Sequence, residues 1–324
     1  MACQLTVAIC MYNAELYIEE TLQCIINQTM QDFHLLIIND KSTDRSEDKV
    51  NEFFTKHPRQ YEIVNIEINQ GLAAGRRYVE EYAKTRYLLF VDADDCPYPT
   101  LVEKLYNTIS SDEDLIAVGC YQNYIDEKGN KMTGGIFLGE TSKEIFLEKA
   151  AKGKLIFMQP TAIYDREAAL SVGGHCIDGF PEGKPRYRDL CEDLDLWTRM
   201  SDLYVNGKAI IVVPEILCGY RKHEKAMSNN SEGMILRMRH IKKNVRRRRA
   251  GKADLTFCQF LDQLSEKERK EIRNEAISAT SLKQSYYAFK KWRIFTGCYY
   301  LMRSTFYNPS YLISKIKHNI LRMK

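Results

Sequence analysis

The chain has 324 residues, of which 44% are hydrophobic and 28% are charged, and this is the composition of an ordinary globular protein. It excludes collagen-like, coiled-coil and low-complexity chains. The net charge of +4 is the sum of two opposite regions, a basic tail and an acidic body. Residues 237–324 hold 22 Lys+Arg and 6 Asp+Glu, a net charge of +16. The first 236 residues hold 25 Lys+Arg and 37 Asp+Glu, a net charge of −12.

The first residues, MACQLTVAICMYN, have no basic region, no long apolar core and no small-residue cleavage site. They therefore do not resemble a signal peptide, and no run in the chain approaches the roughly 18 apolar residues of a spanning helix. The ten cysteines form no CxxC pair and no cluster with zinc spacing. We expect a cytoplasmic protein whose cysteines are free thiols.

Apolar runs of strand length alternate with helical patterns in the first 91 residues. Strands are predicted at 5–10, 33–38, 61–66 and 87–91, and helices between them end near residues 29, 56 and 84. This β-α-β-α-β-α-β order predicts a Rossmann-like α/β fold, with a mostly parallel sheet and helices on its faces.

The rest of the chain is less regular. Strands and a turn at 126–130 are expected between residues 115 and 157, with a helix near 144–151. A loop rich in Gly, Pro and charge covers 177–188, a helix begins near Glu192, and a strand follows at 209–213. Beyond residue 230 the pattern is mainly helical, so we predict a catalytic domain over 1–230 and a helical extension over 231–324.

Polar residues follow the predicted strands directly. In open α/β sheets, ligands bind beyond the carboxyl ends of the strands, which directs attention to Tyr12, Asp40, Asp92 and Asp94. Asp92-x-Asp94 offers the hard oxygen ligands that Mg²⁺ and Mn²⁺ prefer. The alternative is an acidic loop that caps the next helix.

Four polar residues, Asp40 among them, have both a functional and a structural interpretation. Asp40 would accept hydrogen bonds from a nucleotide, or cap a helix through its turn. The Glu192-Asp193 pair would supply a general base, or would cap the helix that it begins. His223 would contact a metal or a phosphate, or would be structural.

Five segments in order resemble family 2 glycosyltransferases of the GT-A fold. The resemblance covers residues 5 to about 225 and is carried by VAICMYNAELYIEETLQCIINQT, LLIINDKSTDRS, NQGLAAGRR, YLLFVDADD and EDLDLWTR. It implies an enzyme that transfers a sugar from a nucleotide-diphosphate sugar.

The resemblance also implies a role for each matching position. Tyr12, Asp40, Gly71, Arg76 and Asp92 would bind the nucleotide sugar. Asp94 and His223 would hold a divalent cation, Mn²⁺ or Mg²⁺, and Asp193 would be the catalytic base. Glu192 and Trp197 would lie near the acceptor or support it. The expected reaction is an inverting transfer, with UDP-sugar as the expected donor and a glycan or a lipid-linked molecule of surface-polysaccharide synthesis as the acceptor.

The basic tail interleaves aromatic and cationic residues between residues 286 and 307. This pattern suits an anionic membrane surface, and a peripheral position on the cytoplasmic face of the inner membrane would follow. A basic helix packed on the catalytic domain explains it equally well. No motif supports nucleic-acid binding.

Two other functions are compatible with the same sheet. A sugar-1-phosphate nucleotidyltransferase would need a Gly-rich triphosphate loop after the first strand, which we do not find. A non-catalytic sugar-nucleotide-binding protein would be expected to lack Asp94 or Asp193, and both are present. A dinucleotide dehydrogenase is disfavoured because no GxGxxG follows the first strand.

Overall fold

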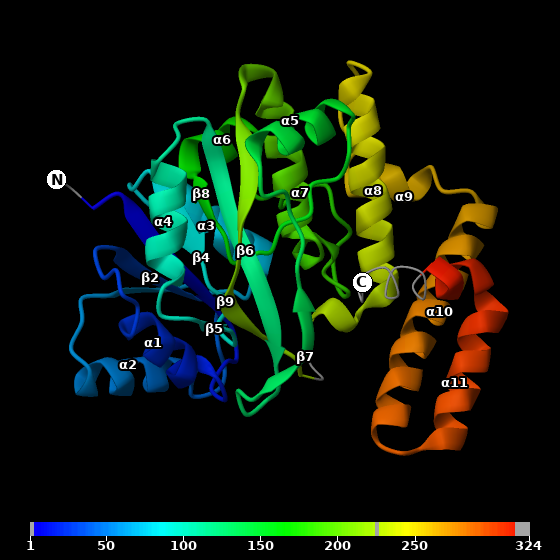
Figure 1. Cartoon of the computed structure of the whole chain (residues 1–324), viewed down its shortest axis with the longest axis horizontal. Helices are drawn as coiled ribbons and strands as arrows, with labels where there is room; N and C mark the ends of the chain where they lie inside the picture. Colours follow the sequence, from blue (N-terminus) through cyan, green and yellow to red (C-terminus); the bar gives the residue numbers. More distant parts are fainter. Residues whose placement is uncertain (1–2, 224–226, 315–324) are drawn as a thin grey trace. The chain divides into compact units, whose positions relative to one another are not determined.

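The computed structural model describes residues 3–223 and 227–314 (Figure 1). They form two compact units. The first comprises residues up to 178, 191–223 and 245–252, and the second comprises 179–190, 227–244 and the residues from 253 onward. The last ten residues of the basic tail lie outside the described part of the chain. The functional boundary expected near residue 230 stays a prediction.

The first unit is built on one sheet, which has nine strands within the described residues. The strands are β1 (Leu5–Met11), β2 (His34–Asn39), β3 (Glu62–Asn65), β4 (Tyr87–Phe90), β5 (Cys96–Pro97), β6 (Leu115–Ile125), β7 (Lys131–Ile136), β8 (Ile163–Asp165) and β9 (Ala209–Arg221). Their order is β3-β2-β1-β4-β8-β6-β9-β5, and β7 pairs with β6.

The β3-β2-β1-β4 half of the sheet is entirely parallel. Strands β1, β2 and β4 are almost continuously apolar and buried, as expected for a parallel sheet that is covered by helices, whereas the edge strand β3 is partly exposed. The predicted α/β alternation is therefore confirmed. The sequence did not predict β8, which pairs antiparallel to both β4 and β6, or the full length of β9.

The helices of the first unit bury their apolar residues on this sheet, as Ile18, Leu22 and Ile25 of α1 do. They are α1 (Ile18–Ile26), α2 (Ser46–Lys56), α3 (Leu72–Tyr82), α4 (Leu101–Ser110), α5 (Lys143–Ala151), α6 (Arg166–Ser171) and α7 (Glu192–Met200). The helices that we predicted before β2, β3 and β4, and near 144–151 and 192, are all present.

The second unit is helical, as the sequence indicates. It contains α9 (Phe257–Asp262), α10 (Glu266–Lys290), α11 (Ile294–Tyr307) and most of α8 (Ser231–Arg249). A small apolar core joins Ile235 and Leu236 to Phe257, Phe260 and Ile272. In the described part of the chain, no helix is both long and apolar enough to cross a membrane.

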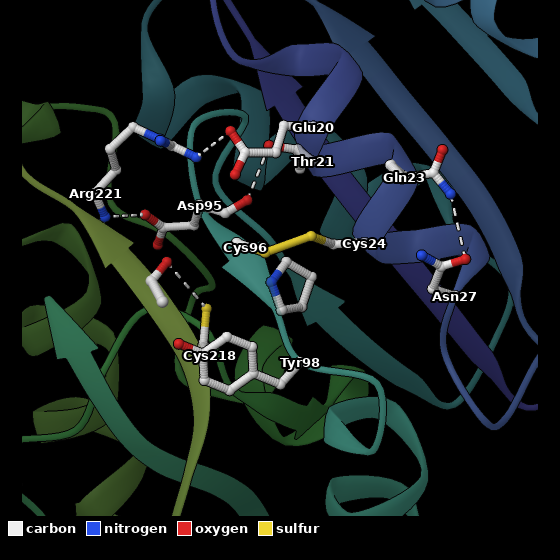
Figure 2. Close-up of a disulfide and its surroundings, with 12 residues drawn as sticks. Glu20, Thr21, Gln23, Cys24, Asn27, Asp95, Cys96, Tyr98, Cys218 and Arg221 are labelled. Carbon is white, nitrogen blue, oxygen red and sulfur yellow. Dashed lines mark hydrogen bonds and ion pairs between the residues drawn. A yellow bond between two sulfur atoms is a disulfide. The ribbon is translucent and has the colours of Figure 1, made fainter. Parts of the chain in front are cut away.

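Two of the ten cysteines are joined, which corrects the prediction that all are free thiols. Cys24 of α1 and Cys96 of β5 form a disulfide, with their Cα atoms 5.9 Å apart (Figure 2). They are 72 positions apart in the sequence, so no local motif predicts the pair. The fold brings them together because β5 follows the acidic loop 92–95, against which α1 packs.

Candidate active site

Asp40 follows β2 and anchors the loop that begins α3. Its carboxylate accepts hydrogen bonds from the backbone N–H groups of Gln70 and Gly71, at 2.7 and 2.6 Å, and from the Asn69 amide at 2.9 Å. Gly71 has φ = 93°, a conformation that favours glycine. Asp40 is buried, so the structure shows it holding this loop, and its contact with a nucleotide base stays a prediction.

Asp94 and His223 lie in direct contact although 129 positions separate them in the sequence. The Nε2 atom of His223 is 2.8 Å from Oδ2 of Asp94, and both side chains are partly exposed. The carboxylate oxygen is a ligand that suits Mn²⁺ or Mg²⁺, and the imidazole nitrogen beside it would be a second, softer ligand, with phosphate oxygens supplying the others. Within the described residues, no group of three or more His, Cys, Asp or Glu side chains could hold a metal by itself.

Arg221 fixes the acidic loop that carries Asp94. Its guanidinium donates to the Asp94 carbonyl at 2.6 Å. The guanidinium also donates to the Glu20 carboxylate at 2.7 Å, and the backbone N–H of Arg221 donates to the Asp95 carboxylate at 2.9 Å (Figure 2). Thr21 also donates to the carbonyl of Asp95. This arrangement could not be predicted from the sequence because its members come from α1, the loop and the end of β9.

Arg76 of α3 joins two of the predicted site residues. Its guanidinium contacts Asp92, after β4, and Glu192, at the start of α7, each at 2.8 Å. Arg76 is only 2% exposed, so these charges interact in a medium that screens them poorly. The structure thus brings together carboxylates that are 100 positions apart.

Asp193 lies next to this cluster on the first turn of α7, and its side chain is partly exposed. Burial raises the pKa of Asp193, whereas the Arg76 charge and the N–H groups of the helix start lower it. Burial also raises the pKa of Glu192, to about 8, against the opposing effect of Arg76. A partly exposed carboxylate beside a buried cation is a suitable place for an acceptor hydroxyl to lose its proton.

Tyr12 and Trp197 lie in opposite environments. Tyr12 follows β1 and is 50% exposed at the same strand ends as Asp40 and Asp92. Trp197 is 2% exposed and packs edge to face on Tyr164 in the hydrophobic core. Trp197 is thus placed to support the fold beneath the site, and its predicted relation to the acceptor stays a prediction.

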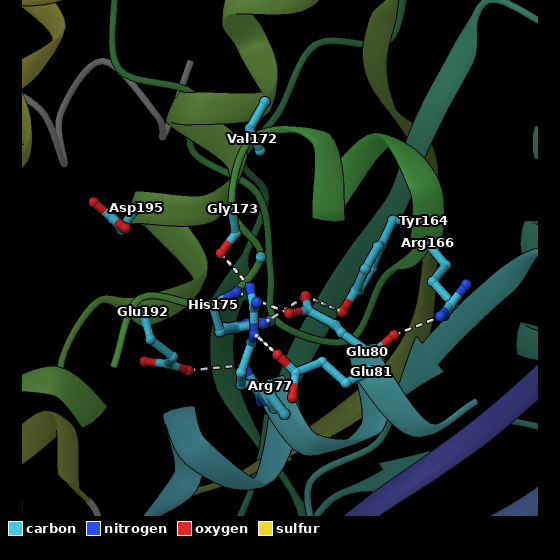
Figure 3. Close-up of polar contacts among 12 residues, drawn as sticks. Arg77, Glu80, Glu81, Tyr164, Arg166, Val172, Gly173, His175, Glu192 and Asp195 are labelled. Carbon is cyan, nitrogen blue, oxygen red and sulfur yellow. Dashed lines mark hydrogen bonds and ion pairs between the residues drawn. The ribbon is translucent and has the colours of Figure 1, made fainter. Parts of the chain in front are cut away.

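A second buried network lies under the site and was not predicted from the sequence. Glu80 of α3 accepts hydrogen bonds from the backbone N–H of His175 and from the Tyr164 hydroxyl, and it contacts Nδ1 of His175 at 2.8 Å (Figure 3). Burial alone would raise the pKa of Glu80, but these partners hold it below its ordinary value. A positive charge on His175 would lower the pKa of Asp193, which links this network to the predicted base.

The chain matches the family model "Glycosyl transferase family 2" over residues 6–173, which is more than half of its length. An uncharacterized glycosyltransferase of Haemophilus influenzae is 24% identical over 97% of this chain and 90% of that protein. Putative glycosyltransferase EpsH of Bacillus subtilis is 29% identical over 49% of this chain and 46% of that protein.

Two solved structures share the fold. Residues 1–349 of Staphylococcus aureus TarS, in complex with UDP-GlcNAc, superpose with a TM-score of 0.54 at 19% identity, over 92% of this chain and 90% of that one. The mannosyltransferase PcManGT of Pyrobaculum calidifontis, in complex with GDP-Man and Mn²⁺, gives a TM-score of 0.54 at 19% identity, over 95% and 87%. They confirm the predicted GT-A-like fold. Together with the family match, these findings show that the chain is a glycosyltransferase and belongs to glycosyl transferase family 2.

Proposed function

We propose that this enzyme transfers a sugar, with inversion, from a nucleotide-diphosphate sugar to a hydroxyl of a glycan or lipid-linked acceptor in the synthesis of a cell-surface polysaccharide. The observation that carries the proposal is the Arg76 cluster. One buried guanidinium binds Asp92 and Glu192, and the partly exposed Asp193 lies beside them. Carboxylates with pKa values perturbed by burial and by a charged partner are concentrated at functional sites, which supports this interpretation.

Asp193 is the proposed base. Its ionised carboxylate takes the proton of the acceptor hydroxyl while that oxygen forms a bond to the anomeric carbon of the donor. The bond from the anomeric carbon to the diphosphate breaks on the opposite face, so an α-linked donor gives a β-glycoside. Glu192, held by Arg76, precedes Asp193 in the chain and would support the acceptor from there.

Asp94 and His223 would hold the divalent cation, which supplies charge to neutralise the leaving diphosphate. Arg221 keeps the Asp94 backbone in place for this purpose. Mn²⁺ accompanies GDP-Man in PcManGT, which supports the choice of cation.

Tyr12, Asp40 and Gly71 form the proposed nucleotide end of the site. Asp40 fixes the loop at Gly71, and Tyr12 offers an exposed ring on which a base can stack. The complex of TarS with UDP-GlcNAc supports a UDP-sugar as donor. A 38% identical segment of 92 residues in a teichoic acid poly(glycerol phosphate) polymerase of Staphylococcus epidermidis supports a surface-polymer acceptor.

The decisive variant is Asp193→Asn, which keeps the shape of the side chain and removes its basicity. We expect transfer to fall by about 10²–10⁴-fold, the usual contribution of a general base, while donor affinity stays unchanged. Thermal stabilisation by UDP-GlcNAc and GDP-mannose, with and without Mn²⁺, measures donor binding. Product formation with the stabilising donor measures transfer. Asp195→Asn on the same helix is the matched control, because that carboxylate is paired with Arg199.

Full turnover by Asp193→Asn would remove the assignment of the base. Failure of every nucleotide sugar to stabilise the wild-type protein in the presence of Mn²⁺ or Mg²⁺ would remove the proposed donor class.

A further inference from the structure

The α10–α11 hairpin is packed with small polar residues on the inside and aromatic residues on the outside. The buried positions of its two helices include Ser278, Ser281, Ser285 and Ala288 on α10 and Gly297 and Ser304 on α11. Water-soluble hairpins bury their largest apolar side chains instead, because that burial drives folding.

Close contact between the two helices depends on these small side chains. Ser278 Oγ lies 2.9 Å from Ser304 Oγ, and Ser285 donates to the Gly297 carbonyl at 2.8 Å. A Cβ atom on Gly297 would come within 2.5 Å of the Phe289 ring. Close backbone approach through Gly and Ser, with hydrogen bonds between the helices, is the packing that helices use where lipid surrounds them.

The outer face of α11 is a continuous apolar stripe. Phe295, Tyr299, Met302 and Phe306 are spaced by four, three and four residues, so they share one face of the helix, opposite Gly297 and Ser304. Phe295 is 93% exposed and Phe306 is 83% exposed. We refer to these four residues as the outer stripe. Large rings exposed on one face indicate an interaction surface.

The turn between the two helices extends this surface and adds charge. All residues from 289 to 296 are exposed, and Trp292 reaches 87% exposure. Lys290, Lys291 and Arg293 flank Trp292, and Arg303 lies beside the outer stripe. From Ala276 to the end, the chain contains nine Lys+Arg and no Asp or Glu, so the charge of this surface favours an anionic partner.

We propose that the α10–α11 hairpin docks on an anionic lipid bilayer, with the outer stripe and Trp292 embedded at the boundary between headgroups and acyl chains. The 14 residues of α11 span about 21 Å, less than the roughly 30 Å of a hydrocarbon core, so this helix lies in the interface and does not cross it. Trp and Tyr favour that depth, and the cations pair with lipid phosphates. The attachment keeps the enzyme at the surface where a lipid-linked acceptor would be held.

The two tryptophans of the chain provide a direct measurement of insertion. In a Trp197→Phe background, Trp292 is the only tryptophan, and excitation at the red edge of the absorption band avoids the tyrosines. We expect its fluorescence to shift to the blue with vesicles of phosphatidylcholine mixed with phosphatidylglycerol, and to be quenched by brominated acyl chains. Phosphatidylcholine alone should have little effect. Soluble glycerol phosphate should leave the emission unchanged, because it supplies the anion without the apolar phase.

Flotation of the full chain with the same vesicles tests which residues carry the binding. We expect Trp292→Ser/Phe295→Ser and Lys290→Glu/Lys291→Glu each to weaken binding by about tenfold or more. Ile68→Ser/Val205→Ser, which removes two exposed apolar side chains from the first unit, should bind as the wild type does.

An unchanged Trp292 spectrum in the presence of vesicles, or wild-type flotation of both double variants, would overturn the proposal. So would a wild-type dimer in solution that Trp292→Ser/Phe295→Ser converts to a monomer without any binding to vesicles, since the stripe would then contact a second copy. Stabilisation of these variants by UDP-GlcNAc or GDP-mannose tests the donor site separately, because no residue of the hairpin belongs to it.

Discussion

The Arg76 cluster and the α10–α11 hairpin depart from the ordinary distribution of residues in opposite directions. In the cluster, a guanidinium and two carboxylates lie inside or at the edge of the core, where charges are costly unless they are paired. In the hairpin, serines are buried and aromatic rings face outward. Each arrangement is unfavourable for an isolated protein in water. Together they indicate two different ligands, a charged one at the strand ends and an apolar anionic surface at the hairpin.

The largest effect is expected from breaking the buried cluster. Arg76→Ala leaves Asp92 and Glu192 without their shared cation and should lower the free energy of unfolding by about 3–5 kcal/mol. The matched control is Arg45→Ala, whose side chain is 62% exposed and pairs with Glu52, and it should cost less than about 1 kcal/mol. Denaturant unfolding of both variants measures the difference. Equal losses of unfolding free energy in the two variants would show that the buried ion pairs stabilise the fold no more than an exposed one does.

The two tryptophans allow the same comparison between a buried and an exposed position, because Trp197 lies in the core and Trp292 on the hairpin surface. Trp197→Ala opens a cavity in the core and should cost about 3–5 kcal/mol of stability. Trp292→Ala removes an exposed ring and should change stability by no more than about 0.5 kcal/mol. Thermal unfolding in lipid-free buffer measures both. A large loss for Trp292→Ala would mean that its ring packs within the protein and is not available to lipid.

The smallest effect is a displacement along the pH axis. The base must be ionised to accept a proton, and burial raises the pKa of Asp193. The rate of transfer should therefore be maximal above that pKa and fall about tenfold per pH unit below it. The decline should begin at a higher pH than it would for an exposed aspartate, whose pKa is about 3.9. Vesicle binding should stay constant over the same range, since Lys and Arg keep their charge. A pH–rate profile and flotation at matched pH values check this.

The sequence predicted the parts of the fold that depend on local pattern. The alternation of apolar strands and helices from Leu5 to Phe90 placed Tyr12, Asp40 and Asp92 at one edge of the sheet, because carboxyl ends of parallel strands coincide. The antiparallel insertion of β8 was not predicted, since three residues carry too little periodicity to be recognised.

The sequence predicted less about the contacts between distant segments. Arg76 was expected near the donor nucleotide, but its contact with Glu192 joins residues 116 positions apart. The Glu80–His175 pair and the Cys24–Cys96 disulfide likewise depend on how α1, α3 and the later loops are placed. Such contacts follow from the tertiary arrangement, and no short-range pattern encodes them.

Arg221 connects the proposed cation site to residues that lie outside it. Its guanidinium joins Glu20 on α1 and the carbonyl of Asp126 in the β6–β7 turn to the carbonyl of Asp94. Neither Glu20 nor Asp126 is among the predicted site residues. Substitution of Glu20, whose carboxylate makes its contact with Arg221, would therefore adjust how firmly the acidic loop is held while the proposed ligands remain intact. The contact with Asp126 is made by its backbone carbonyl and does not depend on the side chain at that position. Evolution or design could thus tune the affinity for the ion from a residue outside the site.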